Sequence, residues 1–239
     1  MTSSAAGSSS SKAKLVIAFD ADDTLWHNEI YYQRAGAKLK TLLEDYLTPE
    51  GIEQALATTE SRNISFYGYG IKSFTLSMVE TAISVSGGGI SAGAILSVLE
   101  LGREMLGADV LLFEHATAAL TRLAGSHELM LITKGDLLEQ GSKIRRSGIA
   151  HLFRYTEIVQ EKTPQTYRLL LERYGIAAGS FVMVGNSLKS DVLPVLEIGG
   201  RAVFVPSEHT WAHEHADGQG HTYFEIEHLG LLPDLISSL

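Results

Sequence analysis

Two aspartates near the start of the chain, Asp20 and Asp22, follow directly after a run of apolar residues. A threonine, Thr24, comes two positions later. Carboxylates placed in this way are able to act as nucleophiles or as general acids and bases. The alternative without chemistry is a cluster of turn and helix-capping side chains after a strand.

Further polar residues follow other apolar runs. Thr133, Lys134 and Gly135 come at the end of one run, and Asn186 comes just after another, with Asp191 five positions on. Lys162 precedes Thr163-Pro164, a pair typical of a helix start, with threonine as the N-cap and proline at the first helical position. The alternatives without chemistry are a solvated surface lysine at 162, a first-turn helix acid at 191 and an ordinary strand end at Thr133. The common position of these residues after apolar runs favours a shared site.

The elements that would position them alternate between strands and helices. The unbroken apolar run 15–19 is typical of a strand buried on both faces of a parallel sheet. Further strands are expected at 128–133, 157–159, 181–184 and 202–205, and helices at 114–124, 137–147, 164–174 and 190–198. This alternation predicts an α/β fold with a Rossmann-like, doubly wound parallel sheet. Such sheets bind ligands beyond the carboxyl ends of their strands, where the polar residues above would converge.

The segment between the first two strands has a different pattern. It predicts helices at 31–46, 49–60, 71–85 and 92–105, separated by breaks at Thr48-Pro49, Gly68-Tyr69-Gly70 and Gly87-Gly88-Gly89. The expected division is therefore a disordered tail over 1–13, an α/β core over 14–28 and 107–239, and an all-helical insert over 29–106.

Composition narrows the function classes. The formal net charge is −9 with a pI of about 5.5, which argues against a nucleic-acid-binding surface. The absence of cysteine excludes disulfides, thiolate metal sites and thiol nucleophiles. No apolar run reaches the length of a membrane span, and the first residues lack the apolar stretch of a signal peptide. We expect no membrane or nucleic-acid partner and a cytoplasmic location, and the oligomeric state is left open.

The order and spacing of these residues resemble the haloacid dehalogenase superfamily, whose members are mostly phosphatases. Its first motif, Asp-x-Asp-x-Thr after an apolar strand, is matched by Asp20, Asp22 and Thr24. Its second, third and fourth motifs are matched by Thr133, by Lys162 and by the stretch from Gly185 to Asp191. One departure is Asn186, which stands where the family commonly has an aspartate, so the metal shell loses one negative charge.

The resemblance implies a magnesium-dependent phosphatase that works through an aspartyl-phosphate. Asp20 would be the nucleophile and Asp22 the general acid and base. The implied Mg²⁺ ligands are the Asp20 carboxylate, the Asp22 carbonyl and the loop carrying Asn186 and Asp191. The implied phosphate-binding residues are Thr133, Lys134, Gly135 and Lys162. Family members that cleave carbon–halogen bonds lack the second aspartate, so Asp22 favours phosphate esters.

The helical insert resembles the cap that this superfamily places between its first and second motifs. A cap of this size favours a small phosphorylated metabolite as substrate. Arg62, Tyr67, Tyr69 and Lys72 surround the Gly68-Tyr69-Gly70 break and are candidates for contacting it. Two other functions remain open: a phosphomutase on the same scaffold, and a non-catalytic ligand-binding module of the same fold.

Overall fold

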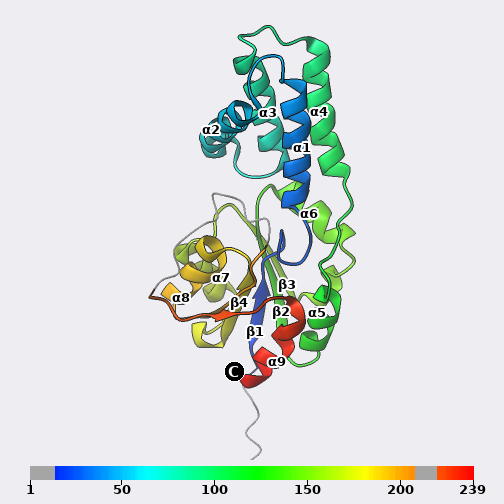
Figure 1. The fold of residues 1–239 in the computed structure, drawn as a ribbon. Helices are drawn as coiled ribbons and strands as arrows, with labels where there is room; N and C mark the ends of the chain where they lie inside the picture. Colours follow the sequence, from blue (N-terminus) through cyan, green and yellow to red (C-terminus); the bar gives the residue numbers. More distant parts are fainter. Residues whose placement is uncertain (1–13, 208–219) are drawn as a thin grey trace, which may run out of the picture.

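The core of the computed structural model is one sheet of six parallel strands (Figure 1). The structure describes residues 14–207 and 220–239, so the tail expected over 1–13 lies outside the described residues. Across the sheet the strands are β3 (Tyr155–Val159), β2 (Glu128–Lys134), β1 (Val16–Phe19), β4 (Phe181–Gly185), β5 (Arg201–Phe204) and β6 (Phe224–Glu225). The predicted Rossmann-like α/β fold is confirmed. The short edge strand β6 was not predicted, because two residues carry no periodicity.

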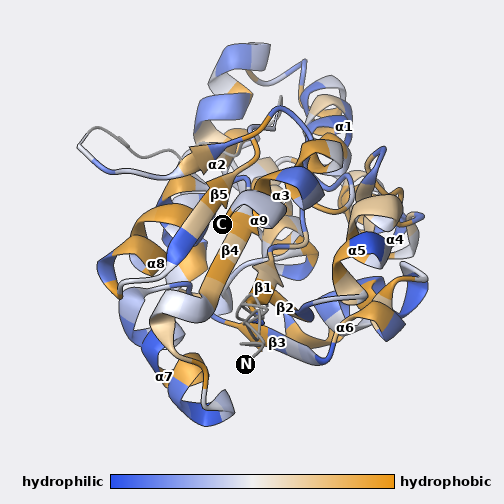
Figure 2. Ribbon diagram, turned by 90° about the horizontal axis from the view of Figure 1, so that it is seen from below, coloured by the Kyte–Doolittle hydropathy of each residue, from blue (hydrophilic) through white to orange (hydrophobic). Residues whose placement is uncertain are grey.

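Helices cover both faces of this sheet, and the side chains of β1 alternate between them. Ile17 and Phe19 pack in one apolar cluster, and Val16 and Ala18 pack in another. The apolar colouring of the central strands is visible in Figure 2. The first cluster includes residues of α5 (Ala116–Ala124), α6 (Leu137–Arg146) and α9 (Leu232–Ser238), and the second includes residues of α7 (Pro164–Tyr174) and α8 (Leu193–Glu197). Burial on both faces explains why β1 reads as a continuous apolar run rather than an alternating one.

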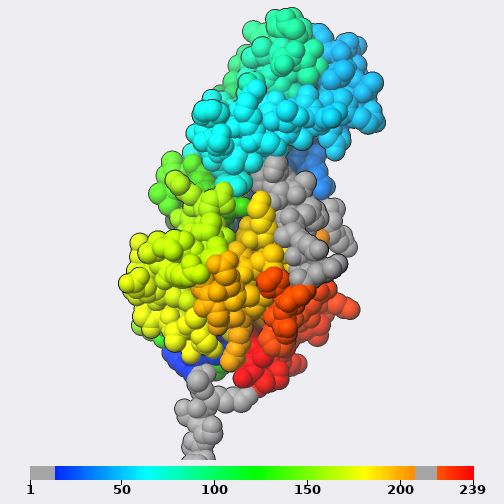
Figure 3. All heavy atoms as spheres, turned by 90° about the vertical axis from the view of Figure 1, so that its left-hand side faces the viewer, coloured from blue at the N-terminus to red at the C-terminus, as the bar shows by residue number. Residues whose placement is uncertain are grey.

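The segment between β1 and α5 forms a separate layer of helices beyond one end of the sheet (Figures 1 and 3). Its helices are α1 (Glu29–Leu42), α2 (Pro49–Tyr67), α3 (Ile71–Val85) and α4 (Ala92–Gly107), and we call them the helical insert. They have an apolar core of their own, built around Leu39, Ile52, Met78 and Val98. Helix α2 runs further than expected, so Arg62 and Tyr67 lie on a helix instead of in a break.

The helix start predicted at Thr163-Pro164 is confirmed, whereas the helix predicted over 190–198 differs from the structure. The Thr163 hydroxyl accepts the N–H of Thr166 and caps α7, with Pro164 in its first turn. The helix expected over 190–198 instead begins with a π-helical turn, Leu188–Val192, before α8. No helix of the described residues is long and apolar enough to cross a membrane.

Candidate active site

The strand-end residues meet because β1 lies between β2 and β4. Asp20 follows β1 and donates its N–H to the carbonyl of Val184, on β4 (2.9 Å). Thr133 and Lys134 end β2, and Asn186 follows β4. Together with Asp22, Lys162 and Asp191 they line one cavity between this edge of the sheet and the helical insert.

Lys162 joins two of the carboxylates at the base of the cavity. Its ammonium lies 2.5 Å from Asp20 Oδ1 and 2.7 Å from Asp191 Oδ1, and the side chains of Lys162 and Asp191 are each only 2% exposed. Burial alone would lower the pKa of Lys162, but the Asp191 and Asp20 carboxylates outweigh it and raise the pKa. Burial raises the pKa of Asp20, and the Lys162 ammonium opposes that rise. The lysine therefore stays charged and favours the ionised carboxylate that a nucleophile requires.

Thr24 connects Asp20 to the fourth motif. Its hydroxyl lies 3.1 Å from both Asp20 Oδ2 and Asn186 Oδ1, and it accepts the N–H of Asn186 (3.1 Å). A hydroxyl has one proton, so it cannot satisfy both oxygens at once. The Asp20 and Asn186 oxygens therefore share the single proton of the Thr24 hydroxyl.

This arrangement fits a hard cation. Carboxylate and amide oxygens are the ligands that Mg²⁺ prefers, and it keeps several waters when protein ligands are few. No three Asp, Glu or His side chains gather as a metal group anywhere in 14–207 and 220–239. The oxygens of Asp20, Asn186 and Asp191, which line the cavity, are the groups available to hold such a cation.

The π-helical turn after β4 places Asp191 at this site. Ser187 caps the turn by accepting the N–H of Ser190, and Asp191 Oδ2 accepts the N–H of Ser187 (3.0 Å). A Cβ added to Gly185 would lie 2.2 Å from that same carboxylate oxygen. Glycine is thus required at 185 because the carboxylate approaches the backbone too closely for any side chain.

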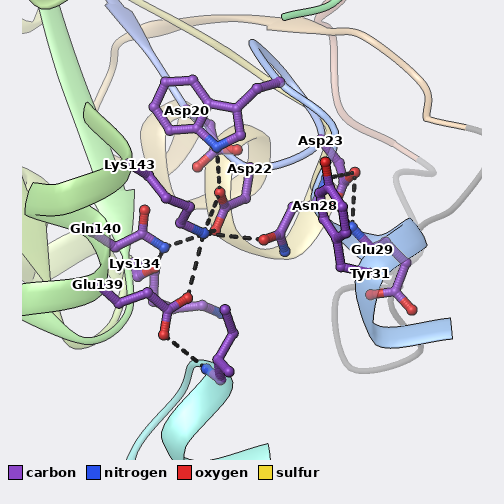
Figure 4. A network of polar contacts seen from close by, with 12 residues as sticks. Asp20, Asp22, Asp23, Asn28, Glu29, Tyr31, Lys134, Glu139, Gln140 and Lys143 are labelled. Atoms are coloured by element: carbon purple, nitrogen blue, oxygen red, sulfur yellow. Dashed lines mark hydrogen bonds and ion pairs between the residues drawn. The ribbon is translucent and has the colours of Figure 1, made fainter. Parts of the chain in front are cut away.

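Asp22 is held by residues that the sequence analysis missed. Both its oxygens lie 2.8 Å from the Lys143 ammonium, Gln140 Nε2 donates to it (2.7 Å), and Trp26 Nε1 donates to it (2.6 Å). Figure 4 shows the Lys143 ammonium at the centre of these contacts. Glu139, Gln140 and Lys143 share one face of α6, and the structure buries that face. In the sequence these residues show only as polar side chains at helical spacing, which is also typical of a solvated face.

Thr133 has a hydroxyl with no partner. The residue is 1% exposed and lines the cavity, and its Oγ1 makes no hydrogen bond. A buried hydroxyl without a partner costs about 1–3 kcal/mol, so a ligand that accepts its proton would remove that cost. Lys134 also lines the cavity, with its ammonium 4.2 Å from the centre of the Tyr69 ring. The N–H of Gly135, expected as a phosphate donor, instead donates to the carbonyl of Val159 (3.2 Å).

Only one of the four candidates on the insert lines the cavity. Tyr69 does so, and its hydroxyl donates to Glu161 (2.6 Å). Lys72 lies outside the cavity lining and pairs with Asp136 (2.7 Å) on the core, while Arg62 pairs with Glu80 within the insert. Tyr67 is exposed and is also absent from the lining.

Two carboxylates of the insert face the cavity in their place. Glu29, at the start of α1, and Glu60, on α2, both line it. Burial, with the neighbouring carboxylates of Asp23 and Glu60, raises the pKa of Glu29 to about 8. Burial raises the pKa of Glu60 to about 7. Sequence reasoning missed both because each reads as an ordinary helix-surface acid.

Fold and cavity together define a Rossmann-like α/β protein with a polar site at the carboxyl edge of its sheet. A family model described as haloacid dehalogenase-like hydrolase matches residues 15–199. The chain therefore belongs to the haloacid dehalogenase-like hydrolases. Among curated proteins, none matches this sequence.

Solved structures agree with that assignment. A haloacid dehalogenase-like family hydrolase from Xanthomonas campestris is 38% identical, with 95% of this chain and 91% of that chain covered and a TM-score of 0.85. The putative HAD-hydrolase YfnB from Bacillus subtilis, bound to magnesium, is 19% identical, with coverage of 94% and 99% and a TM-score of 0.66. A 2-haloacid dehalogenase from Pseudomonas syringae is 20% identical, with coverage of 95% and 99% and a TM-score of 0.63. At identities of 19% and 20%, the last two structures show the shared fold alone. The reaction must therefore be inferred from the residues of the site.

Proposed function

We propose that the protein is a magnesium-dependent phosphatase that hydrolyses a small phosphate monoester through an aspartyl-phosphate on Asp20. The observation that carries this proposal is the unpartnered hydroxyl of Thr133 in the same cavity as the Asp20–Lys162 pair. A phosphoryl oxygen accepts hydrogen bonds, so it would satisfy that hydroxyl while its phosphorus lies in reach of the carboxylate.

Asp20 would attack phosphorus, forming the acyl-phosphate bond as the ester P–O bond breaks. Asp22, which must be protonated at the start of this step, would give its proton to the departing oxygen, which leaves as a neutral alcohol. Lys143 and Gln140 hold the Asp22 carboxylate in one orientation at the cavity wall. Asp22 would then take a proton from water as that water attacks phosphorus, releasing inorganic phosphate and restoring Asp20.

Charge explains why a metal is part of the proposal. A carboxylate and a phosphate oxygen about 4 Å apart repel by about 4 kcal/mol per pair of unit charges at an effective dielectric near 20. A Mg²⁺ ion held by Asp20, the Asp22 carbonyl, Asn186 and Asp191 would offset that repulsion. Two observations support a magnesium site. The side-chain oxygens of Asp20 and Asn186 both approach the Thr24 hydroxyl, and the similar Bacillus subtilis protein is described as bound to magnesium.

Asp22 favours phosphate esters over carbon–halogen substrates. A halide leaves without a proton, so a dehalogenase has no use for a second carboxylate that protonates the leaving group. Here that carboxylate lines the cavity and is oriented by three donors.

The test is hydrolysis of p-nitrophenyl phosphate by the full chain with Mg²⁺ and with EDTA. We expect phosphate release that requires Mg²⁺, is abolished in Asp20→Asn and is weakened in Thr133→Val. Chloride release from 2-chloropropionate, measured in parallel, should be absent. Activity that survives in EDTA or in Asp20→Asn would refute the mechanism, and halide release without phosphatase activity would assign the site to dehalogenation. Turnover that needs an added sugar bisphosphate and yields no free phosphate would identify a mutase.

A further inference from the structure

The side of the cavity formed by the insert carries carboxylates, which would repel any anionic group that a substrate carries besides its phosphate. Of the described residues that line the cavity, the insert supplies two carboxylates, Glu29 and Glu60, and no lysine, arginine or histidine. The cations expected there, Arg62 and Lys72, pair elsewhere with Glu80 and Asp136. On the core side, Lys162 and Lys134 are already engaged with Asp20 and Asp191 and with the Tyr69 ring.

Among the described residues, 14–207 and 220–239, the two carboxylates have no cationic partner. Neither Glu29 nor Glu60 forms an ion pair or a side-chain hydrogen bond with another described residue. Both are half-buried, which is costly for an ionised carboxylate unless a cation approaches it. Their raised pKa values express the same cost.

Two further buried polar groups of the cavity lack partners. Ser73, on α3, is 4% exposed, and its hydroxyl makes no hydrogen bond. Gln140 is 2% exposed, and its Oε1 accepts none, although its Nε2 donates to Asp22. That donation fixes the amide orientation, so the free atom is an acceptor. A ligand group that pairs with the Gln140 oxygen must therefore be a donor, and the Ser73 hydroxyl is able to accept from a donor as well.

The aromatic lining selects the kind of donor. Tyr32 and Phe74, on α1 and α3, line the same region, with ring centres 4.9 Å apart. Tyr32 and Phe74 also line a second cavity together with Glu29 and Glu60, so the two rings and the two carboxylates belong to the same part of the insert. Aromatic faces beside carboxylates attract alkylammonium groups. A bare metal ion is a poorer fit, because no three Asp, Glu or His side chains group as a metal site within the described chain.

We propose that the substrate's leaving group carries a protonated amine, held by Glu29 and Glu60 over the Tyr32 and Phe74 rings. The inference rests on the proposed phosphatase function and specifies its substrate class, an amine-bearing phosphate monoester. The phosphate would lie against Thr133 and Lys162, and the ammonium against the insert. The cavity would then hold an anion at one end and a cation at the other.

The experiment compares matched pairs of substrates, ω-aminoalkyl and ω-hydroxyalkyl phosphates with two to six carbons, on the full chain with Mg²⁺. A hydrogen bond to a charged group contributes about 1.5–3 kcal/mol, so we expect kcat/KM for the best amine to exceed that of its hydroxyl partner by about 10- to 100-fold. The double variant Glu29→Gln/Glu60→Gln keeps the shape of the side chains and should lose this preference. Glu44→Gln removes one charge from an exposed position of the insert outside the cavity and should keep it.

The outcomes separate the two proposals. Equal kcat/KM within every pair, or a preference that survives in the double variant, would overturn the amine inference while p-nitrophenyl phosphate hydrolysis still supports the phosphatase. If p-nitrophenyl phosphate is not hydrolysed, the phosphatase proposal fails, and calorimetric titration of the same phosphates decides the amine inference. Tighter binding of the amines to wild type than to the double variant would support it, and equal binding would refute it.

Discussion

Replacing Lys162 with methionine would leave two buried carboxylates facing each other. The Lys162 ammonium lies 2.5 Å from an Asp20 oxygen and 2.7 Å from an Asp191 oxygen, so these oxygens are no more than 5.2 Å apart (2.5 Å plus 2.7 Å). At an effective dielectric near 20, two unit charges at that separation repel by about 3 kcal/mol. Breaking a buried ion pair costs about 3–5 kcal/mol in general, which is consistent with that value. We expect Lys162→Met to lower the free energy of unfolding by about 3 kcal/mol at pH 8.

The loss should depend on pH and on magnesium. Without the lysine, burial keeps the pKa of Asp20 raised with no cation to oppose the rise. A carboxyl with a raised pKa in the folded state stabilises it below the unfolded pKa and loses that contribution as pH increases. The deficit should therefore shrink between pH 8 and pH 5, and Mg²⁺ should reduce it at pH 8 by replacing the missing positive charge.

Urea unfolding followed by circular dichroism, at pH 8 and pH 5 with EDTA or Mg²⁺, measures these differences. The matched control is Lys38→Met, since Lys38 forms an exposed ion pair with Glu104 (2.7 Å). Exposed pairs contribute about 0–1 kcal/mol, so this variant should change little at either pH. A Lys162→Met deficit that equals the control, or that is the same at pH 5 and pH 8, would refute the reasoning.

Three other predictions concern the same cavity. Thr133→Val should raise the inhibition constant of inorganic phosphate about tenfold, because the phosphate loses a hydrogen-bond donor. The free energy of unfolding should stay equal or rise, because the variant removes a buried hydroxyl without a partner. A less stable variant would contradict this. Gly185→Ala should displace the Asp191 carboxylate, 2.2 Å from the new Cβ, and lower kcat at least tenfold, by about 1.4 kcal/mol or more, as steady-state kinetics would show. Burial raises the pKa of Glu29 to about 8 and that of Glu60 to about 7, in both cases from an ordinary value of 4.5, so the free energy of unfolding should fall as pH rises from about 4.5 to about 8. Glu29→Gln/Glu60→Gln should flatten that fall in urea titrations, and an unchanged pH profile would exclude these two groups as its source.

The positions of the strand-end residues were predictable because they depend on local patterns and one general rule. Apolar runs bounded by turn residues identified β1, β2 and β4, and parallel strands in a doubly wound sheet bring their carboxyl ends to one edge. These two facts predicted that Asp20, Thr133, Asn186 and Asp191 would lie together, and all four line one cavity. Their spacing along the chain also carried the resemblance to the family that the chain belongs to.

The partners of Asp22 and the charge of the insert side were decided by tertiary structure. Lys143 pairs with an aspartate far away in sequence, and it reaches that aspartate because α6 packs with its polar face toward the cavity. The insert expected to present Arg62 and Lys72 instead presents Glu29 and Glu60. A helix-surface residue of either sign looks the same in sequence, and only the rotation of α1 and α2 against the core determines which side chains face inward. The sequence by itself thus determined at which edge of the sheet the polar site would lie, while helix packing decided which charges lie opposite it.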